Sequence, residues 1–87
     1  MRTITLHRTN HVLDRSFPLR IFVNDILIGT MLTNDEFSFE IDDTMNSFQI
    51  TYTSRIETIK SYTIYIGPGE ASLNYDVIEY KNYIDVI

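Results

Sequence analysis

The residues best suited to chemistry lie between positions 7 and 15, where two histidines, two arginines and an aspartate occur close together. On a helix, His7 and His11 would share one face at an i, i+4 spacing, with Asp14 nearby, as in divalent metal sites. However, no further ligand such as Glu or Cys follows at a recognisable spacing, and His7 ends a segment with strand-like alternation. We therefore predict no metal and no other cofactor, and we interpret these histidines as residues of an exposed loop.

The same segment favours the binding of an anion. Residues 1–20 carry four arginines and one aspartate, a net charge of +3, whereas residues 21–87 carry three bases and eleven acids, a net charge of -8. A basic N-terminal patch on an acidic body attracts an anionic ligand or the acidic face of another copy. As an alternative function, we name Arg8, His11 and Arg15 as candidate ligands of an anion or a carbohydrate.

Nucleic acid is disfavoured as a partner. The chain is acidic, with a pI near 4.7, and its aromatic residues are not interleaved with its arginines. Proteins that bind nucleic acid usually show a basic stripe or patch instead.

Catalytic motifs are missing from the sequence. There is no cysteine to act as a thiol nucleophile, and no serine occupies a G-x-S-x-G turn. The carboxylate pairs Asp35-Glu36 and Asp42-Asp43 both fall in expected turns, where aspartate is favoured for local hydrogen bonding. The segment Gly67-Pro68-Gly69 lacks the Lys-Ser/Thr of a phosphate-binding loop and predicts a type II turn. We predict that the protein is not an enzyme.

Strand-forming residues dominate the composition. Thirteen isoleucines, ten threonines, six tyrosines, five phenylalanines and four valines make up 38 of the 87 residues, and alanine occurs once. This composition argues against a helical protein. Alternation of apolar and polar residues predicts strands near 2–7, 18–23, 26–31, 37–41, 48–53, 59–66, 73–77 and 83–87. We expect one domain, residues 1–87, folded as a small antiparallel β-sandwich of seven or eight short strands.

Two local signals refine this expectation. Asn24-Asp25 lies between strand-like runs, and both residue types tolerate positive φ, which predicts a tight two-residue hairpin. Gly29, inside the returning strand, indicates a β-bulge or a close approach of another group to the backbone.

No signal peptide or membrane span is visible. An alternating segment follows Met1, and the longest apolar runs are only three residues. We therefore expect a cytoplasmic protein without a membrane partner.

Several apolar residues do not fit a single core face. Tyr62 and Tyr65 have opposite parity, so on a regular strand at least one of them is exposed. The final strand carries one charge and, at a sheet edge, could pair with another chain. We name as candidate interface residues Phe22, Tyr65, Tyr83, Ile84 and Val86. They predict an accessory or interaction module that self-associates or binds a protein partner.

The central part of the chain also resembles a known kind of module. Residues 19–30 run strand, Asn-Asp turn, and strand with Gly29, and residues 37–42 follow as a cleanly alternating strand. This order is similar to small bacterial β-sandwich modules such as PEGA-type domains and similar domains of unknown function. The chain has Asn24-Asp25 where a glycine is usual, and it lacks the Pro-Glu-Gly-Ala signature. The resemblance implies an accessory or interaction domain without catalytic residues.

Overall fold

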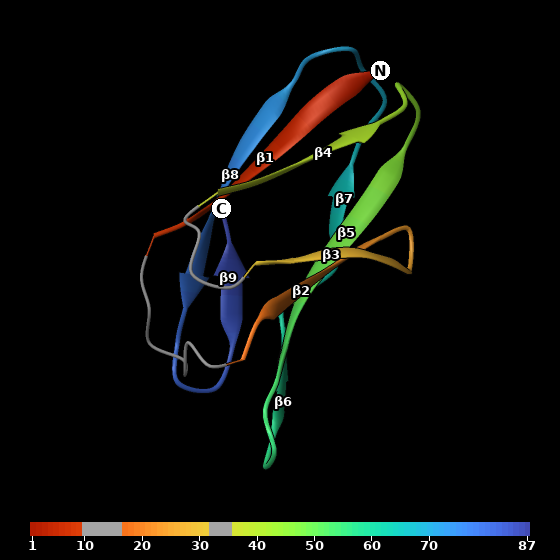
Figure 1. Ribbon diagram of the computed structural model, residues 1–87. Coiled ribbons are helices and arrows are strands. Elements are labelled where there is room, and N and C mark those ends of the chain that lie inside the picture. Colours follow the sequence, from red (N-terminus) through yellow and green to blue (C-terminus); the bar gives the residue numbers. More distant parts are fainter. Residues whose placement is uncertain (10–16, 32–35) are drawn as a thin grey trace.

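The computed structural model describes residues 1–9, 17–31 and 36–87, which form a sandwich of two packed β-sheets (Figure 1). These described residues contain nine strands: β1 (Arg2–Arg8), β2 (Leu19–Val23), β3 (Ile26–Met31), β4 (Glu36–Ile41), β5 (Asn46–Thr53), β6 (Thr58–Lys60), β7 (Ile64–Ile66), β8 (Leu73–Glu79) and β9 (Ile84–Val86). Within the described ranges there is no helix, and so none that is long and apolar enough to cross a membrane. The predicted all-β fold is confirmed.

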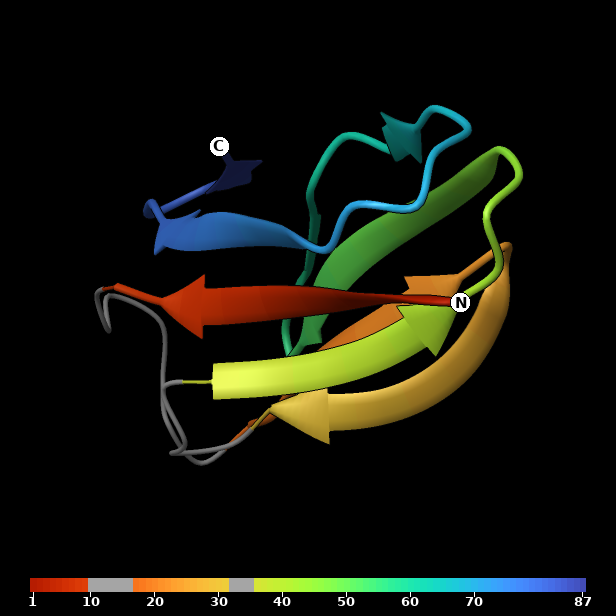
Figure 2. The same ribbon diagram turned by 90° about the horizontal axis from the view of Figure 1, so that it is seen from above.

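The two sheets differ in how their strands are ordered. Sheet A has the order β4-β1-β8-β9, and sheet B has the order β3-β2-β5-β6, with β7 also pairing with β5. The ladders between described strands are antiparallel except for β1 and β8, which run parallel. The edge strands β4 and β3 of the two sheets lie side by side in Figure 2.

The core follows from the alternation along the strands. In β1, for example, Ile4 and Leu6 are fully buried, whereas the alternating Thr3 and Thr5 are only partly covered. Aromatic contacts join the sheets: the Phe48 ring of β5 meets Phe39 of β4 and Tyr75 of β8 edge-on, at centroid distances of 5.9 and 5.2 Å. Removing these apolar surfaces from water is what holds the two sheets together.

The predicted hairpin at Asn24-Asp25 is confirmed. Both residues have positive φ, 49° and 68°, as a type I′ turn requires. Asn24 also anchors the turn to the neighbouring strand, since its side-chain oxygen accepts a hydrogen bond from the Ser47 backbone and its amide donates to Asn46.

Both predictions for Gly29 are confirmed. The β2–β3 register shifts beside it, and a Cβ at Gly29 would lie 2.6 Å from Cζ of Phe37. The Phe37 ring therefore occupies the space that any larger residue at position 29 would need.

Two expectations about the second half of the chain are wrong. The single strand expected over 59–66 is broken into β6 and β7, because Ser61 interrupts the ladder with β5. The segment Gly67-Pro68-Gly69 does not form a type II turn, which needs positive φ at its second glycine, since neither glycine has one. Instead, the Gly69 N–H donates a hydrogen bond to the Asp43 carbonyl at 2.9 Å.

The N-terminus is fixed by a buried arginine. The Arg2 guanidinium donates hydrogen bonds to the backbone carbonyls of Asp42, Thr44 and Gly67, at 3.2, 2.9 and 2.6 Å. It thereby joins β1 to the β4–β5 turn and to the end of β7. Arg2 is thus a structural residue, only 4% exposed, and does not contribute a surface charge to a basic N-terminal patch.

Candidate functional site

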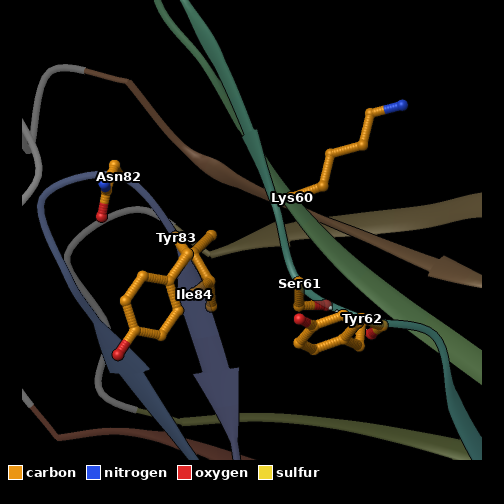
Figure 3. Close-up of a pocket in the computed structure, with 6 residues that line it drawn as sticks. All are labelled: Lys60, Ser61, Tyr62, Asn82, Tyr83 and Ile84. Carbon is orange, nitrogen blue, oxygen red and sulfur yellow. Dashed lines mark hydrogen bonds between the residues drawn. The ribbon is translucent and has the colours of Figure 1, made fainter.

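A pocket of about 610 Å³ opens where the two sheets meet, beside the break between β6 and β7. It is lined by Lys60, Ser61, Tyr62, Asn82, Tyr83 and Ile84, and we call it the tyrosine pocket. Figure 3 shows the Tyr83 ring on the β8–β9 side of the pocket and the Tyr62 ring on the opposite side, while Lys60 extends away from both rings. Pockets of this size are typical of sites that take a side chain or a small ligand.

Ser61 forms the floor of the tyrosine pocket and explains why the pocket exists. Its N–H donates to the Ile50 carbonyl, and its hydroxyl accepts the Ile50 N–H at 3.0 Å, in place of a ladder carbonyl. The hydroxyl in turn donates to the Tyr62 carbonyl at 2.9 Å. This local pairing buries Ser61 and turns the next side chain outward, so Tyr62 is 85% exposed.

The opposite side of the pocket is built by the turn between β8 and β9. The Tyr80 N–H donates to the Tyr83 carbonyl at 2.9 Å, and the two rings stack at a centroid distance of 4.4 Å and an angle of 9°. Partial loss of hydration, together with repulsion from Tyr80 and Asp85, raises the pKa of Tyr83 above its ordinary value. The Tyr83 ring, stacked on Tyr80, presents an amphipathic surface to the pocket.

The two sheets are joined directly at the pocket. Ser61 and Ile84 form an isolated parallel bridge, which connects the edge of sheet B to the first residue of β9. Ile84 is 1% exposed, so its side chain belongs to the core while its backbone forms the pocket wall. The walls of the pocket are thus fixed by main-chain contacts rather than by mobile side chains alone.

The groups that line the pocket are suited to recognition by contact. The Ser61 hydroxyl is engaged on both sides by Ile50 and Tyr62, which leaves it poorly placed as a nucleophile. In the part of the chain that the structure covers, no group of three or more His, Cys, Asp or Glu side chains could hold a metal ion. Two aromatic rings and an asparagine remain as contact groups.

The comparisons with known proteins add no relative. No protein-family model matches the chain, and no curated protein and no solved structure matches it either. The resemblance to PEGA-type modules stays a prediction.

Of the predicted anion ligands, only Arg8 lies within the described residues, and it is not on the surface. Arg8 is buried, and its guanidinium binds Glu79 through two hydrogen bonds of 2.5 and 2.9 Å, with both side chains fully removed from solvent. The expectation that Arg8 is an accessible ligand is thereby corrected, because its charge is compensated inside the fold. His11 and Arg15 lie outside the described residues.

The predicted interface residues fall into three environments. Tyr83 lies in the tyrosine pocket and is 46% exposed. Phe22, half-buried, and Tyr65, 71% exposed, lie on the outer face of sheet B. Ile84 is buried, and Val86 packs against the core. Ile84 is therefore a core residue, contrary to the prediction, whereas Val86 is partly buried against the core, because β9 pairs with β8 and turns both side chains inward.

The final strand does lie at the edge of its sheet, as the edge-pairing hypothesis required. Ile87 is nevertheless bound to β8 through both of its backbone groups, which exchange hydrogen bonds with Asp76 at 2.8 and 3.0 Å. The end of the chain is therefore held within its own sheet.

Two exposed apolar sites in the structure were not predicted from the sequence. Regular alternation over 59–66 would place Tyr62 on the same side as Ile64 and Ile66, which pack in or against the core, but the break at Ser61 turns Tyr62 outward. The edge strand β3 also exposes three consecutive apolar residues, Ile26, Leu27 and Ile28, by 67%, 50% and 43%. The signal for the second site was available, since a run of three apolar residues without a charge is unusual at a sheet edge.

Proposed function

We propose that the protein is a non-catalytic interaction module that binds a segment of another protein in the tyrosine pocket. The observation that carries this proposal is the pair of exposed rings, Tyr62 and Tyr83, on opposite sides of a pocket whose floor is fixed by the hydrogen bonds between Ser61 and Ile50. A rigid ring contributes a large contact area at a low cost in side-chain entropy, and tyrosine is enriched at interaction hot spots.

The pocket favours an apolar or aromatic side chain of the partner. Such a group would contact the faces of the two tyrosine rings, and Asn82 offers an amide that can bind the partner's backbone. Lys60 extends away from the rings, so it does not place a charge against the bound group. The partner segment is therefore expected to carry one apolar anchor residue within an otherwise polar sequence.

A peptide-display selection tests this proposal. A random peptide library is selected on the intact protein and counter-selected on the Tyr62→Ala/Tyr83→Ala variant. Because the chain has no tryptophan, its six tyrosines are the intrinsic fluorophores, and binding of each selected peptide can be followed by tyrosine fluorescence and by calorimetry. We expect peptides with an apolar anchor whose affinity falls at least about tenfold in the variant, equivalent to about 1.4 kcal/mol.

Tyr65→Ala is the matched control, since Tyr65 is exposed but lies outside the pocket. It should leave the peptide affinity unchanged, and thermal unfolding should show that all variants are folded. If the selection yields no peptide that distinguishes the wild-type protein from the double variant, the proposal is wrong.

A further inference from the structure

The outward faces of the two sheets carry opposite charge. Along β2, β3, β5, β6 and β7, the side chains directed away from the core include two bases and no acid; they are Arg20, Phe22, Leu27, Thr30, Ser47, Gln49, Thr51, Thr53, Thr58, Lys60 and Tyr65. We call this set face B. Several of its members line a shallow depression of about 260 Å³, at whose rim Asp25 in the hairpin turn is the one acid.

The outward face of sheet A is acidic. Its side chains include four carboxylates and no lysine or arginine; they are Thr3, Thr5, His7, Glu36, Ser38, Glu40, Asn74, Asp76, Ile78 and Asp85. We call this set face A. The structure thus places charges of opposite sign on the two broad surfaces of one thin sandwich.

The charges on the two faces also match in spacing. On face B, Arg20 pairs with Thr51 and Thr51 pairs with Lys60, so the two cations stand two strands apart. On face A, Glu36 pairs with His7 and His7 pairs with Asp76, so the two carboxylates stand two strands apart as well. Neighbouring strands are separated by about 4.8 Å, which gives about 9.6 Å between the charged residues in both rows.

The charged groups of both rows are available for contact. The side chains of Arg20, Lys60 and Asp76 are exposed and make no hydrogen bond or ion pair with any residue whose placement is described. Glu36 has only a long contact of 3.7 Å with His7, and its side chain is 62% exposed. Thr51, between the two cations, is only 6% exposed and forms the bottom of the depression.

We propose that face B of one copy docks on face A of a second copy, with Arg20 and Lys60 opposite Glu36 and Asp76. The complementary sign and the shared two-strand spacing select another copy of this chain as the occupant. The contact uses different surfaces on the two copies, so it is heterologous and extends into a chain or closes into a ring. It is separate from the tyrosine pocket and does not depend on the function proposed for it.

The association is weak and sensitive to salt. Exposed ion pairs contribute little individually, and Phe22 and Leu27 are the main apolar side chains that face B adds to the contact. The Debye length, beyond which exposed charges are largely screened from one another, is about 8 Å at physiological ionic strength and about 30 Å at 0.01 M. We expect self-association in the range of hundreds of micromolar at about 20 mM salt, weakened at least about tenfold at 150 mM.

Charge reversal in two separate variants tests the proposal by sedimentation equilibrium. One variant, Arg20→Glu/Lys60→Glu, makes the charged row of face B acidic, and the other, Glu36→Lys/Asp76→Lys, makes the charged row of face A basic. In each variant alone the two rows that would meet then have the same sign, and the variant should be monomeric. An equimolar mixture should associate again, because the basic row on face A of one variant fits the acidic row on face B of the other.

Arg55→Glu/Lys81→Glu is the matched control, since it changes the net charge by the same amount at exposed positions in turns. It should associate as the wild-type protein does, and so should Tyr62→Ala/Tyr83→Ala. The proposal is overturned if the wild-type protein is monomeric at about 1 mM protein and about 20 mM salt. It is also overturned if association survives either reversal, or if the mixture of the two variants stays monomeric.

Discussion

The backbone N–H of Ile50, in β5, donates a hydrogen bond of 3.0 Å to the hydroxyl of Ser61, which is buried between β6 and β7. A side chain therefore completes the ladder of sheet B where a backbone carbonyl would normally do so. The same hydroxyl donates to the Tyr62 carbonyl, so one side chain fixes both the strand break and the exposure of the tyrosine beside it.

Replacing Ser61 by alanine should destabilise the protein by about 1–3 kcal/mol, because a buried N–H loses its acceptor. Urea unfolding of the Ser61→Ala variant measures the change. Ser38→Ala is the control, since the Ser38 hydroxyl bonds Thr5 in an exposed position, and its effect should stay within about 0.5 kcal/mol. An equal loss of stability in both variants would contradict the ladder role of Ser61.

Removal of one partner from the buried ion pair between Arg8 and Glu79 should lower the unfolding free energy more than the loss of a partner in any other polar contact. Glu79→Gln leaves the Arg8 guanidinium in the interior without this counter-charge, and we expect a loss of about 3–5 kcal/mol in unfolding free energy. Glu36→Gln, which disturbs only the exposed contact with His7, should cost less than about 1 kcal/mol.

A second variant separates the cost of removing one charge of the pair from the loss of packing. In Arg8→Met/Glu79→Leu both charges are replaced by apolar side chains, and we expect it to be more stable than Glu79→Gln. If the double variant is the less stable of the two, the ion pair itself contributes more than its desolvation costs.

Asp42 should make stability depend on pH in the acid range. Hydrogen bonds from the Thr44 side chain, the Asn46 amide and the Thr44 backbone lower the pKa of Asp42 from 3.8 to about 2. Because the pKa is lower in the folded state, the carboxylate stabilises the protein above pH 3.8, and this contribution is lost as the pH falls toward 2. The melting temperatures of the wild-type protein and Asp42→Asn should therefore converge between about pH 5 and pH 2. Asp43→Asn, outside this hydrogen-bond set, provides the control.

The all-β class and the Asn24-Asp25 hairpin could be predicted because both depend on local patterns of residue type. The strand break at Ser61 could not, because alternation continues through residues 59–66 and the interruption comes from the hydroxyl bonding across to β5. The burial of Arg2 and Arg8 could not be predicted either, because it also depends on contacts with residues far away in the sequence. Their partners, such as Gly67 and Glu79, lie more than sixty residues away in the sequence, and a count of charges treats every arginine as exposed.

The candidate site was recovered only in part. Tyr83 was among the interface residues named from the sequence, but the opposing ring belongs to Tyr62, whose direction depends on the break. The row of Arg20 and Lys60 depends on the register of β2, β5 and β6, and no sequence spacing between residues 20 and 60 encodes that register.

The contact between Gly29 and Phe37 joins β3 to β4, the edge strands of the two sheets, and position 29 should therefore be sensitive to substitution. A methyl group at position 29 would lie 2.6 Å from Cζ of Phe37, so the ring must move, and the ring is itself packed near Phe39 at a centroid distance of 6.4 Å. We expect Gly29→Ala to destabilise the protein by about 1–3 kcal/mol through overpacking.

A double-mutant cycle with Phe37→Leu identifies the source of that loss. The smaller side chain leaves room for the methyl group, so Gly29→Ala should cost at least about 0.5 kcal/mol less in the Phe37→Leu background. Gly29 has no positive φ, and an alanine there requires no unusual backbone conformation. A penalty of the same size in both backgrounds would therefore show that the Phe37 ring is not the source of the loss.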